Sequence, residues 1–132
     1  MLFVLATDSV KRSEALCDYL EPRLDGSDAV LAVNSQRGGD RTSTEKLDRG
    51  EEALSVVERR LSGIVPVDTR QVVRGNDPTE DVLGVVERYE PDEIVMGIRR
   101  HSATSKLVFG SVAQDILMTA NVPMRVVPVP EE

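Results

Sequence analysis

The chain has 132 residues and a formal net charge of −7, with 40% hydrophobic and only 3% aromatic residues. This length suits one domain with an aliphatic core and leaves no room for a second core. The negative charge and the few aromatic rings argue against a nonspecific nucleic-acid binder and against a stacking platform for single strands.

The amino-terminal part alternates buried strands with a helix. Residues 2–6 are a continuous apolar run, as a strand buried on both faces requires. A helix is predicted from about 11 to 24, because its apolar residues fall on one side. Residues 29–33 are the second buried strand, and the polar, glycine-containing stretch 34–41 predicts a flexible loop.

A second helix and a third strand follow. The sequence Thr42-x-x-Glu45, or Ser43, can start the helix, and apolar residues at helical spacing continue it to Leu61. Residues 65–74 form a strand with more polar alternation, which indicates a position near the edge of the sheet.

The third helix has a strong start signal. Asp77 can cap it, Pro78 suits its first position, and Glu80 can reach back to the cap amide. A buried apolar stripe then runs to Tyr89, and Pro91 ends the helix.

The last elements are a strand over 93–96, a helix over about 111–121 and a strand over 124–129. Strands that alternate with helices predict right-handed crossovers and an α/β fold. We therefore expect a single three-layer domain, with an open parallel five-stranded sheet and helices on both faces.

Ligands of open parallel sheets bind beyond the carboxyl ends of the strands, where the winding reverses. Two segments should emerge there, residues 6–9 and 97–111. The second contains no Asp or Glu, although acids outnumber bases in the chain. Its basic and hydroxyl-bearing side chains are Arg99, Arg100, His101, Lys106, Ser102, Thr104, Ser105 and Ser111. Such a donor-rich island in an acidic protein predicts an anion site.

Two glycines strengthen this prediction. Gly110 and Ser111 stand at a helix start, where free amides and the helix dipole favour a phosphate. Gly97 directly follows a strand and would let a ligand approach the backbone closely.

Simpler readings stay open for the same residues. Ser111-x-x-Gln114 is itself a capping box, and Arg99 and Arg100 could be solvated charges. His101 has no second His or Cys nearby, so it is interpreted as a surface histidine and not as a metal ligand. Asp8 either caps the first helix or binds a ribose or base, and Thr7 and Ser9 are ambiguous in the same way.

The segment that begins at Gly97 and runs through Gly110-Ser111 resembles the signature loop of universal stress proteins, which in ATP-binding members reads Gly, two residues, Gly, nine residues, Gly, then Ser or Thr. Residues 4–9, 75–78 and 122–127 are similar to other parts of that family. The resemblance spans the chain, so residues 1–132 are identified as one universal stress protein domain. It implies an adenine nucleotide alpha hydrolase-like fold with strand order 3-2-1-4-5.

The resemblance also implies a ligand, a site and an assembly. The ligand would be ATP or a related nucleotide, with Mg²⁺, and the protein would act in the stress response as a homodimer paired through its last strand, Met124 to Val129. The implied contacts on the adenosine side are Thr7, Asp8 and Val33. Those at the bend after the fourth strand are Met96 and Gly97, and those at the start of the phosphate-binding helix are Gly110, Ser111 and Val112.

One position departs from the family pattern, because Arg100 stands where the second loop glycine is expected. Its side chain could clamp the phosphates together with Arg99 or Lys106, which gives an ATP-binding regulatory module. It could instead block them, which gives a dimeric interaction protein that binds no nucleotide. A backbone path different from the family's is a further consequence of this residue.

Catalysis is not the expected role of the domain. No base is evidently placed against an attacking water and no carboxylate cluster for magnesium is visible, so any ATP hydrolysis should be slow. The end of the third strand lacks the Asp of a phospho-receiver, and the sequence contains neither a Rossmann fingerprint nor a P-loop.

Composition bears on the environment of the protein. The single Cys17 excludes an intrachain disulfide and lies in a predicted helix interior, so it is a poor candidate for a reactive thiol. The first apolar run is too short for a membrane span and no signal-peptide pattern precedes it, so we expect a cytoplasmic protein. Thirteen Arg against three Lys on an acidic protein indicate a halophilic surface.

Overall fold

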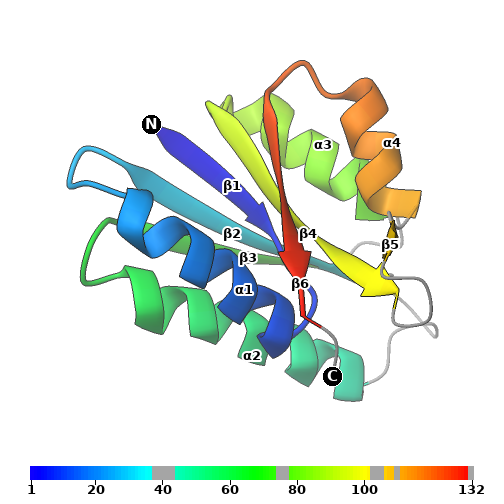
Figure 1. Ribbon diagram of the computed structural model, residues 1–132, viewed down its shortest axis with the longest axis horizontal. Coiled ribbons are helices and arrows are strands. Elements are labelled where there is room, and N and C mark those ends of the chain that lie inside the picture. The colour runs from blue at the N-terminus through cyan, green and yellow to red at the C-terminus, as the bar shows by residue number, and fades with distance from the viewer. Residues whose placement is uncertain (37–43, 74–77, 102–105, 109–110, 131–132) are drawn as a thin grey trace.

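The computed structural model describes residues 1–36, 44–73, 78–101, 106–108 and 111–130. Its elements alternate as the sequence predicts (Figure 1). In chain order they are β1 (Leu2–Ala6), α1 (Val10–Leu20), the short 3-10 helix η1 (Glu21–Arg23), β2 (Ala29–Gln36), α2 (Thr44–Leu61), β3 (Val67–Val73), α3 (Pro78–Tyr89), β4 (Glu93–His101), β5 (Lys106–Val108), α4 (Ser111–Thr119) and β6 (Met124–Val129).

Five strands form a parallel sheet in the predicted order. β3, β2, β1 and β4 are neighbours in that sequence, and β6 pairs with β4 on the side away from β1. The prediction of strand order 3-2-1-4-5 is confirmed, with β6 as the fifth parallel strand. β3 lies at an edge of the sheet, which agrees with its polar alternation.

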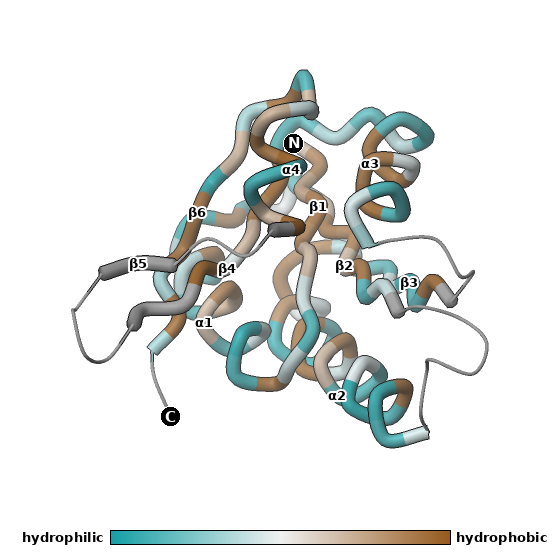
Figure 2. The backbone as a smooth tube through the Cα atoms, turned by 90° about the vertical axis from the view of Figure 1, so that its right-hand side faces the viewer, coloured by the Kyte–Doolittle hydropathy of each residue, from teal (hydrophilic) through white to brown (hydrophobic). Residues whose placement is uncertain are grey.

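Helices cover both faces of this sheet (Figure 1). On one face α1 and α2 pack through residues such as Leu16 and Val57 against Leu5 and Val95. On the other face α3 and α4 pack against β1 and β4, with Ile116 fully buried in that cluster. The brown apolar segments of Figure 2 run along the strands and the inner sides of the helices. The chain is therefore the three-layer α/β domain expected from its pattern.

The prediction of a polar loop over residues 34–41 is wrong for the first three of these residues. β2 continues through Asn34 and Ser35 to Gln36, in register with β3, and Asn34 is completely buried. A buried polar residue in a strand is accepted only where hydrogen bonds satisfy it, and Asn34 has such bonds. The remainder of that loop lies outside the described residues.

The segment after the fourth strand also differs from the prediction. β4 does not end at Met96 but runs on to His101, and residues 106–108 form an antiparallel strand against it. Arg100 pairs with Leu107 in this hairpin, so position 100 has an extended backbone. An extended conformation suits any side chain, whereas the predicted turn would have favoured glycine.

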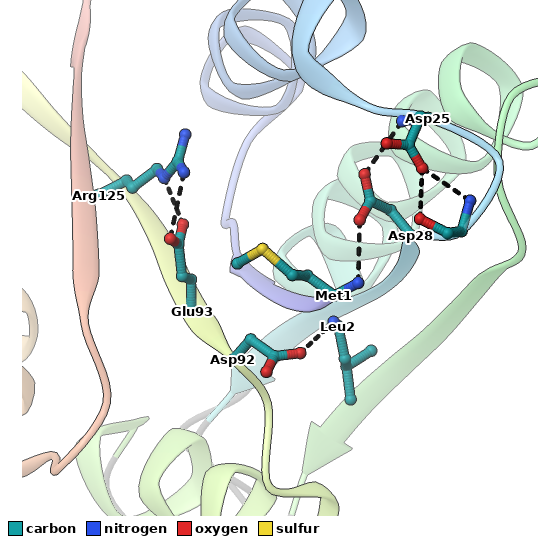
Figure 3. Close-up of polar contacts among 8 residues, drawn as sticks. Met1, Leu2, Asp25, Asp28, Asp92, Glu93 and Arg125 are labelled. Atoms are coloured by element: carbon teal, nitrogen blue, oxygen red, sulfur yellow. Dashed lines mark hydrogen bonds and ion pairs between the residues drawn. The ribbon is translucent and has the colours of Figure 1, made fainter.

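Charged groups tie the amino ends of the strands together (Figure 3). The Met1 amine donates to Asp28 Oδ1 at 2.9 Å, and the Leu2 amide donates to Asp92 Oδ2 at 2.6 Å. Glu93 at the start of β4 forms an ion pair with Arg125 of β6. These contacts fix the end of the sheet opposite to the one where a ligand is expected.

Within the described ranges, no helix has both the length and the apolar character that a membrane crossing requires. Cys17 is fully buried in α1, and this burial raises the pKa of its thiol to about 11. The thiol is therefore protonated at neutral pH, as expected for a structural cysteine.

Candidate functional site

The sheet reverses its winding between β1 and β4. From β1 the chain proceeds outward to β2 and β3 on one side, and later to β4 and β6 on the other. At the carboxyl end of β1, Ala6 pairs with Val33 of β2 and with Met96 of β4. This carboxyl edge is where an open parallel sheet binds its ligand.

Thr7 follows β1 directly, and both its amide and its hydroxyl form hydrogen bonds within the protein. Its amide donates to the Val33 carbonyl at 3.0 Å, and its hydroxyl lies 2.7 Å from the Ser13 hydroxyl. Ser13 in turn donates to the carbonyl of Ala53 in α2 at 2.7 Å. The buried Thr7 side chain therefore links the end of β1 to both helices of this face.

Asn34 fixes the same edge from β2. Its side-chain amide donates to the Thr7 carbonyl at 2.9 Å, and its carbonyl oxygen accepts from Gln71 Nε2 of β3 at 3.2 Å. Gln71 Nε2 also donates to the Leu47 carbonyl of α2 at 2.9 Å. Three neighbouring strands thus meet through the buried Asn34 amide, and Gln71 connects them to α2, which makes the edge a rigid platform.

Space for this amide comes from Gly50 of α2. A Cβ atom added at position 50 would lie 2.1 Å from Asn34 Oδ1 and 2.6 Å from Gln71 Nε2. The helix passes close to the strands because this residue has no side chain. Sequence reasoning missed the pair, since it assigned Asn34 to a loop; a polar residue at the end of a buried strand, with a glycine in the next helix, was the available signal.

Asp8 is exposed at the start of the β1–α1 turn. It does not cap α1, because the side chain of Ser9 accepts the Arg12 amide as the N-cap. The Asp8 carboxylate is 62% exposed and lies 3.3 Å from Nη1 of Arg12. Of the two roles left open for Asp8, capping is therefore wrong, and the carboxylate faces solvent at the carboxyl edge.

Gly97 is buried against neighbouring side chains. A Cβ atom there would lie 2.6 Å from Val129 Cγ2 and 3.0 Å from Arg12 Cγ. The missing side chain thus makes room for β6 and for Arg12, which is a packing reason for glycine at this position. Arg12 was not among the residues predicted for the site, because in sequence it is one of several charges on α1.

Met96 and Val112 join the edge from the other face. Met96 is buried in the cluster of α3 and α4, together with Ala6, and the half-buried Val112 packs against the same cluster. The first turn of α4 therefore packs against the cluster that contains the last residue of β1 and Met96 within β4. The sequence placed Met96 at the bend after the fourth strand, but β4 runs on to His101, so Met96 lies within the strand.

The β4–β5 hairpin borders the same place. Arg99 pairs with Val129 of β6 and with Val108 of β5, so these two strands lie on opposite edges of β4. β5 is consequently on the edge of β4 that faces β1, and its pairing with β4 starts at Arg99, three residues beyond the pairing of Met96 with Ala6. The hairpin extends the sheet past the carboxyl end of β1.

The remaining predicted site residues are described only in part. The backbones of Arg99 and Arg100 belong to β4 and that of Ser111 begins α4, but their side chains lie outside what the structure describes. Gly110 lies entirely outside the described residues. The basic island predicted over this segment is therefore a sequence observation.

A buried carboxylate stands beside the end of β2. Asp81, in the first turn of α3, accepts a hydrogen bond from the Ser35 hydroxyl at 2.5 Å. A helix amino terminus favours such a negative charge. In the described part of the chain, no three His, Cys, Asp or Glu side chains gather closely enough to hold a metal ion.

Comparison with known proteins identifies relatives of this chain. A model described as the universal stress protein family matches residues 4–128 of the chain. A universal stress protein of Mycolicibacterium smegmatis is 32% identical over 97 residues, which are 74% of each chain.

Two solved structures of universal stress protein from Archaeoglobus fulgidus have the same fold. The first is 29% identical, with a TM-score of 0.74, and the alignment covers 96% of this chain and 98% of the other. The second, in complex with dAMP, is 26% identical, with a TM-score of 0.69 and coverages of 96% and 97%.

Proposed function

The chain belongs to the universal stress protein family, and from this membership we propose that it binds an adenine nucleotide at the carboxyl edge of its sheet, between β1 and β4. The observation that carries the proposal is the solved Archaeoglobus fulgidus relative, which has dAMP bound and aligns over 96% of this chain. The role that fits such a site is that of a nucleotide-binding regulatory module.

The carboxyl edge offers suitable chemistry for this ligand. Asp8 presents an exposed carboxylate, which can accept hydrogen bonds from sugar hydroxyls or from an exocyclic amine. The backbone around Thr7 and Val33 is held by the buried Asn34 amide, so a base stacked there would meet a preorganised surface. Ser111 begins α4, and a helix amino terminus favours a phosphate when a second group helps to bind it.

ATP with Mg²⁺ is the finer form of this proposal. Mg²⁺ usually keeps several waters and is bound through one or two carboxylates together with the phosphates of its nucleotide. Since Asp8 is assigned to the nucleoside, we propose that the ion at this site would be bound mainly by the phosphates of ATP and by water. We propose that any hydrolysis of the bound ATP is slow.

Arg100 decides whether the phosphates have access. Its backbone is extended and paired with Leu107, so the hairpin does not use the turn for which a glycine would be needed. We propose that the long side chain leaves the phosphate position open. The alternative is a dimeric interaction protein in which Arg100 occupies that position.

Calorimetric titration of the full chain tests these proposals. AMP, dAMP, ATP and ATP with Mg²⁺ are titrated into the wild type and into Arg100→Gly. Binding of adenine nucleotides by the wild type, with dissociation constants below the millimolar range, is the expected result. If neither protein binds any of them at millimolar concentration, the proposal is wrong. If only Arg100→Gly binds, the interaction-protein alternative is correct.

We further propose that the protein forms a homodimer through β6. This strand pairs with β4 on one edge, and within the described residues no strand covers its other edge. Val126 is half-buried there, and an apolar open edge is a liability that pairing with a second copy removes. Pro128 in the same strand lacks an amide donor, which limits how far such pairing can extend.

Sedimentation velocity tests the dimer. The wild type should sediment as a dimer at micromolar concentration, and Val126→Lys, which places a charge on the edge, should shift it to the monomer. A wild type that remains monomeric throughout would contradict the proposal.

A further inference from the structure

Arg12 bridges the two strands between which the sheet reverses. Its Nη1 atom lies 3.3 Å from Asp8 Oδ1, beyond the end of β1. Its Cγ and Cδ atoms lie 3.0 Å and 3.3 Å from the position that a Cβ of Gly97 would take in β4. The guanidinium therefore stands at the carboxyl edge, between the segment predicted to contact adenosine and the bend predicted to precede the phosphates.

The hydrogen bonding of this guanidinium is incomplete. Its Nε–H is buried and has no acceptor among the residues that the structure describes. A guanidinium stays charged in proteins and carries five donors, so a buried unpaired donor costs free energy. The observed conformation of Arg12 thus leaves part of its hydrogen-bonding capacity unused.

Other arginines of the protein show what complete pairing looks like. Arg60 meets both oxygens of Glu21, with Nε to Oε1 at 3.0 Å and Nη2 to Oε2 at 2.8 Å. This is the bidentate geometry that a guanidinium prefers. Arg12 lacks such a bidentate partner within the described residues. Its place at the carboxyl edge, where a ligand is expected, would explain why its Nε donor is left free for an anion.

The contact with Asp8 is easily given up. Asp8 is 62% exposed and lies in the turn before α1, four residues before Arg12, so water reaches the carboxylate side of the pair. Such exposed pairs contribute little to stability. The side chain can therefore turn toward an anion and lose only a weak interaction.

From these contacts we propose that Arg12 is a phosphate-binding residue of the nucleotide site, with Nε and one Nη donating to two oxygens of the phosphate nearest the sugar. The inference rests on the proposed function, because it assigns a residue to that site. It places a phosphate-binding cation on α1, in addition to the cations that the sequence suggested after β4.

Arg12→Gln is the variant that separates binding from packing. Glutamine keeps the Cγ and Cδ atoms that fill the space beside Gly97 and Val129, and it removes the charge and the forked donors. Lys11→Gln is the matched control, since it removes the same charge from the adjacent residue of the same helix. Arg12→Lys keeps the charge without the bidentate fork and serves as a second variant should the glutamine variant fold poorly.

The test compares AMP with adenosine by calorimetry on the full chain at fixed ionic strength. Arg12→Gln should weaken AMP binding by about tenfold to a hundredfold and leave adenosine binding within about twofold of wild type. Lys11→Gln should stay within about twofold of wild type for both ligands. Arg12→Lys should fall between the wild type and Arg12→Gln for AMP.

Four results would overturn the inference, and they are distinguishable. Equal loss of AMP and adenosine affinity in Arg12→Gln would make Arg12 a structural residue, and unchanged AMP affinity would remove it from the site; in both cases the proposed function stands. Absence of AMP and adenosine binding in the wild type would end both proposals. A parallel titration with inorganic phosphate identifies the source of the anion, since Arg12-dependent binding of phosphate without AMP binding would assign a free-anion site and contradict the inference.

Discussion

Gly50 offers a sharp test of the platform under the candidate site. In an exposed helix interior, replacing Gly by Ala stabilises a protein by about 1 kcal/mol. At position 50 the new Cβ would lie 2.1 Å from Asn34 Oδ1, closer than a non-bonded carbon and oxygen atom can approach. The Asn34 amide must then leave its place, and its bond to the Thr7 carbonyl at 2.9 Å is lost.

The magnitude follows from these opposing terms. Overpacking a well-filled core costs about 1–3 kcal/mol, and a buried polar group left without its partner costs about 1–3 kcal/mol. After subtraction of the gain in helix propensity, Gly50→Ala should lower the free energy of unfolding by about 3 kcal/mol. Equilibrium urea unfolding followed by circular dichroism measures this change.

Two controls make the reasoning refutable. Gly84→Ala in α3 adds a Cβ that meets nothing within 4 Å, so it should stabilise the protein by about 1 kcal/mol. In an Asn34→Ala background the nearest obstacle is gone and Gln71 Nε2, at 2.6 Å, is the one that stays, so the cost of Gly50→Ala should fall by about 1 kcal/mol or more. The account is refuted if Gly50→Ala is as stable as the wild type, or if its cost is unchanged when Asn34 is absent.

Three further predictions concern other parts of the fold. Glu90, directly after α3, has a left-handed φ of 47°, which glycine adopts more easily than glutamate. Glu90→Gly should therefore raise the free energy of unfolding in urea by about 1 kcal/mol, and a decrease would contradict this interpretation. Hydrogen bonds from the Asp25 amide and the Met1 amine lower the pKa of Asp28, so its stabilisation is present at neutral pH and is lost as pH falls below about 4. Asp28→Asn should therefore flatten the acid limb of a stability–pH curve, and a limb as steep as in the wild type would count against this. The melting temperature should rise between low and molar KCl, because salt screens repulsion within an acidic chain; a temperature indifferent to salt would exclude a halophilic surface.

The parallel sheet could be predicted because its signals are local. Residues 2–6 and 29–33 are uninterrupted apolar runs, and strands buried on both faces need such runs. The helix after β1 begins near its predicted start because Ser9 is a side-chain cap, which short-range hydrogen bonding determines.

The errors arose where tertiary contacts override local composition. Asn34 was assigned to a loop, yet Thr7 and Gln71 satisfy its amide and a glycine of α2 leaves it room. The extension of β4 to His101 depends on pairing with residues 106–108, which the family pattern of a glycine loop did not suggest. Contacts between residues far apart in the chain cannot be predicted from the residue spacing within one segment.

Within the candidate site, the sequence indicated the neighbourhood better than the contacts. Ala6, at the end of β1, pairs with Val33 and with Met96, as the order of the strands requires, and Val112 packs against the cluster that contains Ala6 and Met96. Arg12 escaped notice because only the packing of α1 over Gly97 brings it there.

The position of a bound nucleotide tests the central claim most directly. A crystal structure of the protein grown with AMP should show the nucleotide between β1 and β4, with its sugar near Asp8 and its phosphate on the Arg12 guanidinium, now turned from the carboxylate that it contacts at 3.3 Å. A structure in which that edge stays empty at a concentration that saturates binding in solution, or in which AMP occupies another surface, would contradict the account.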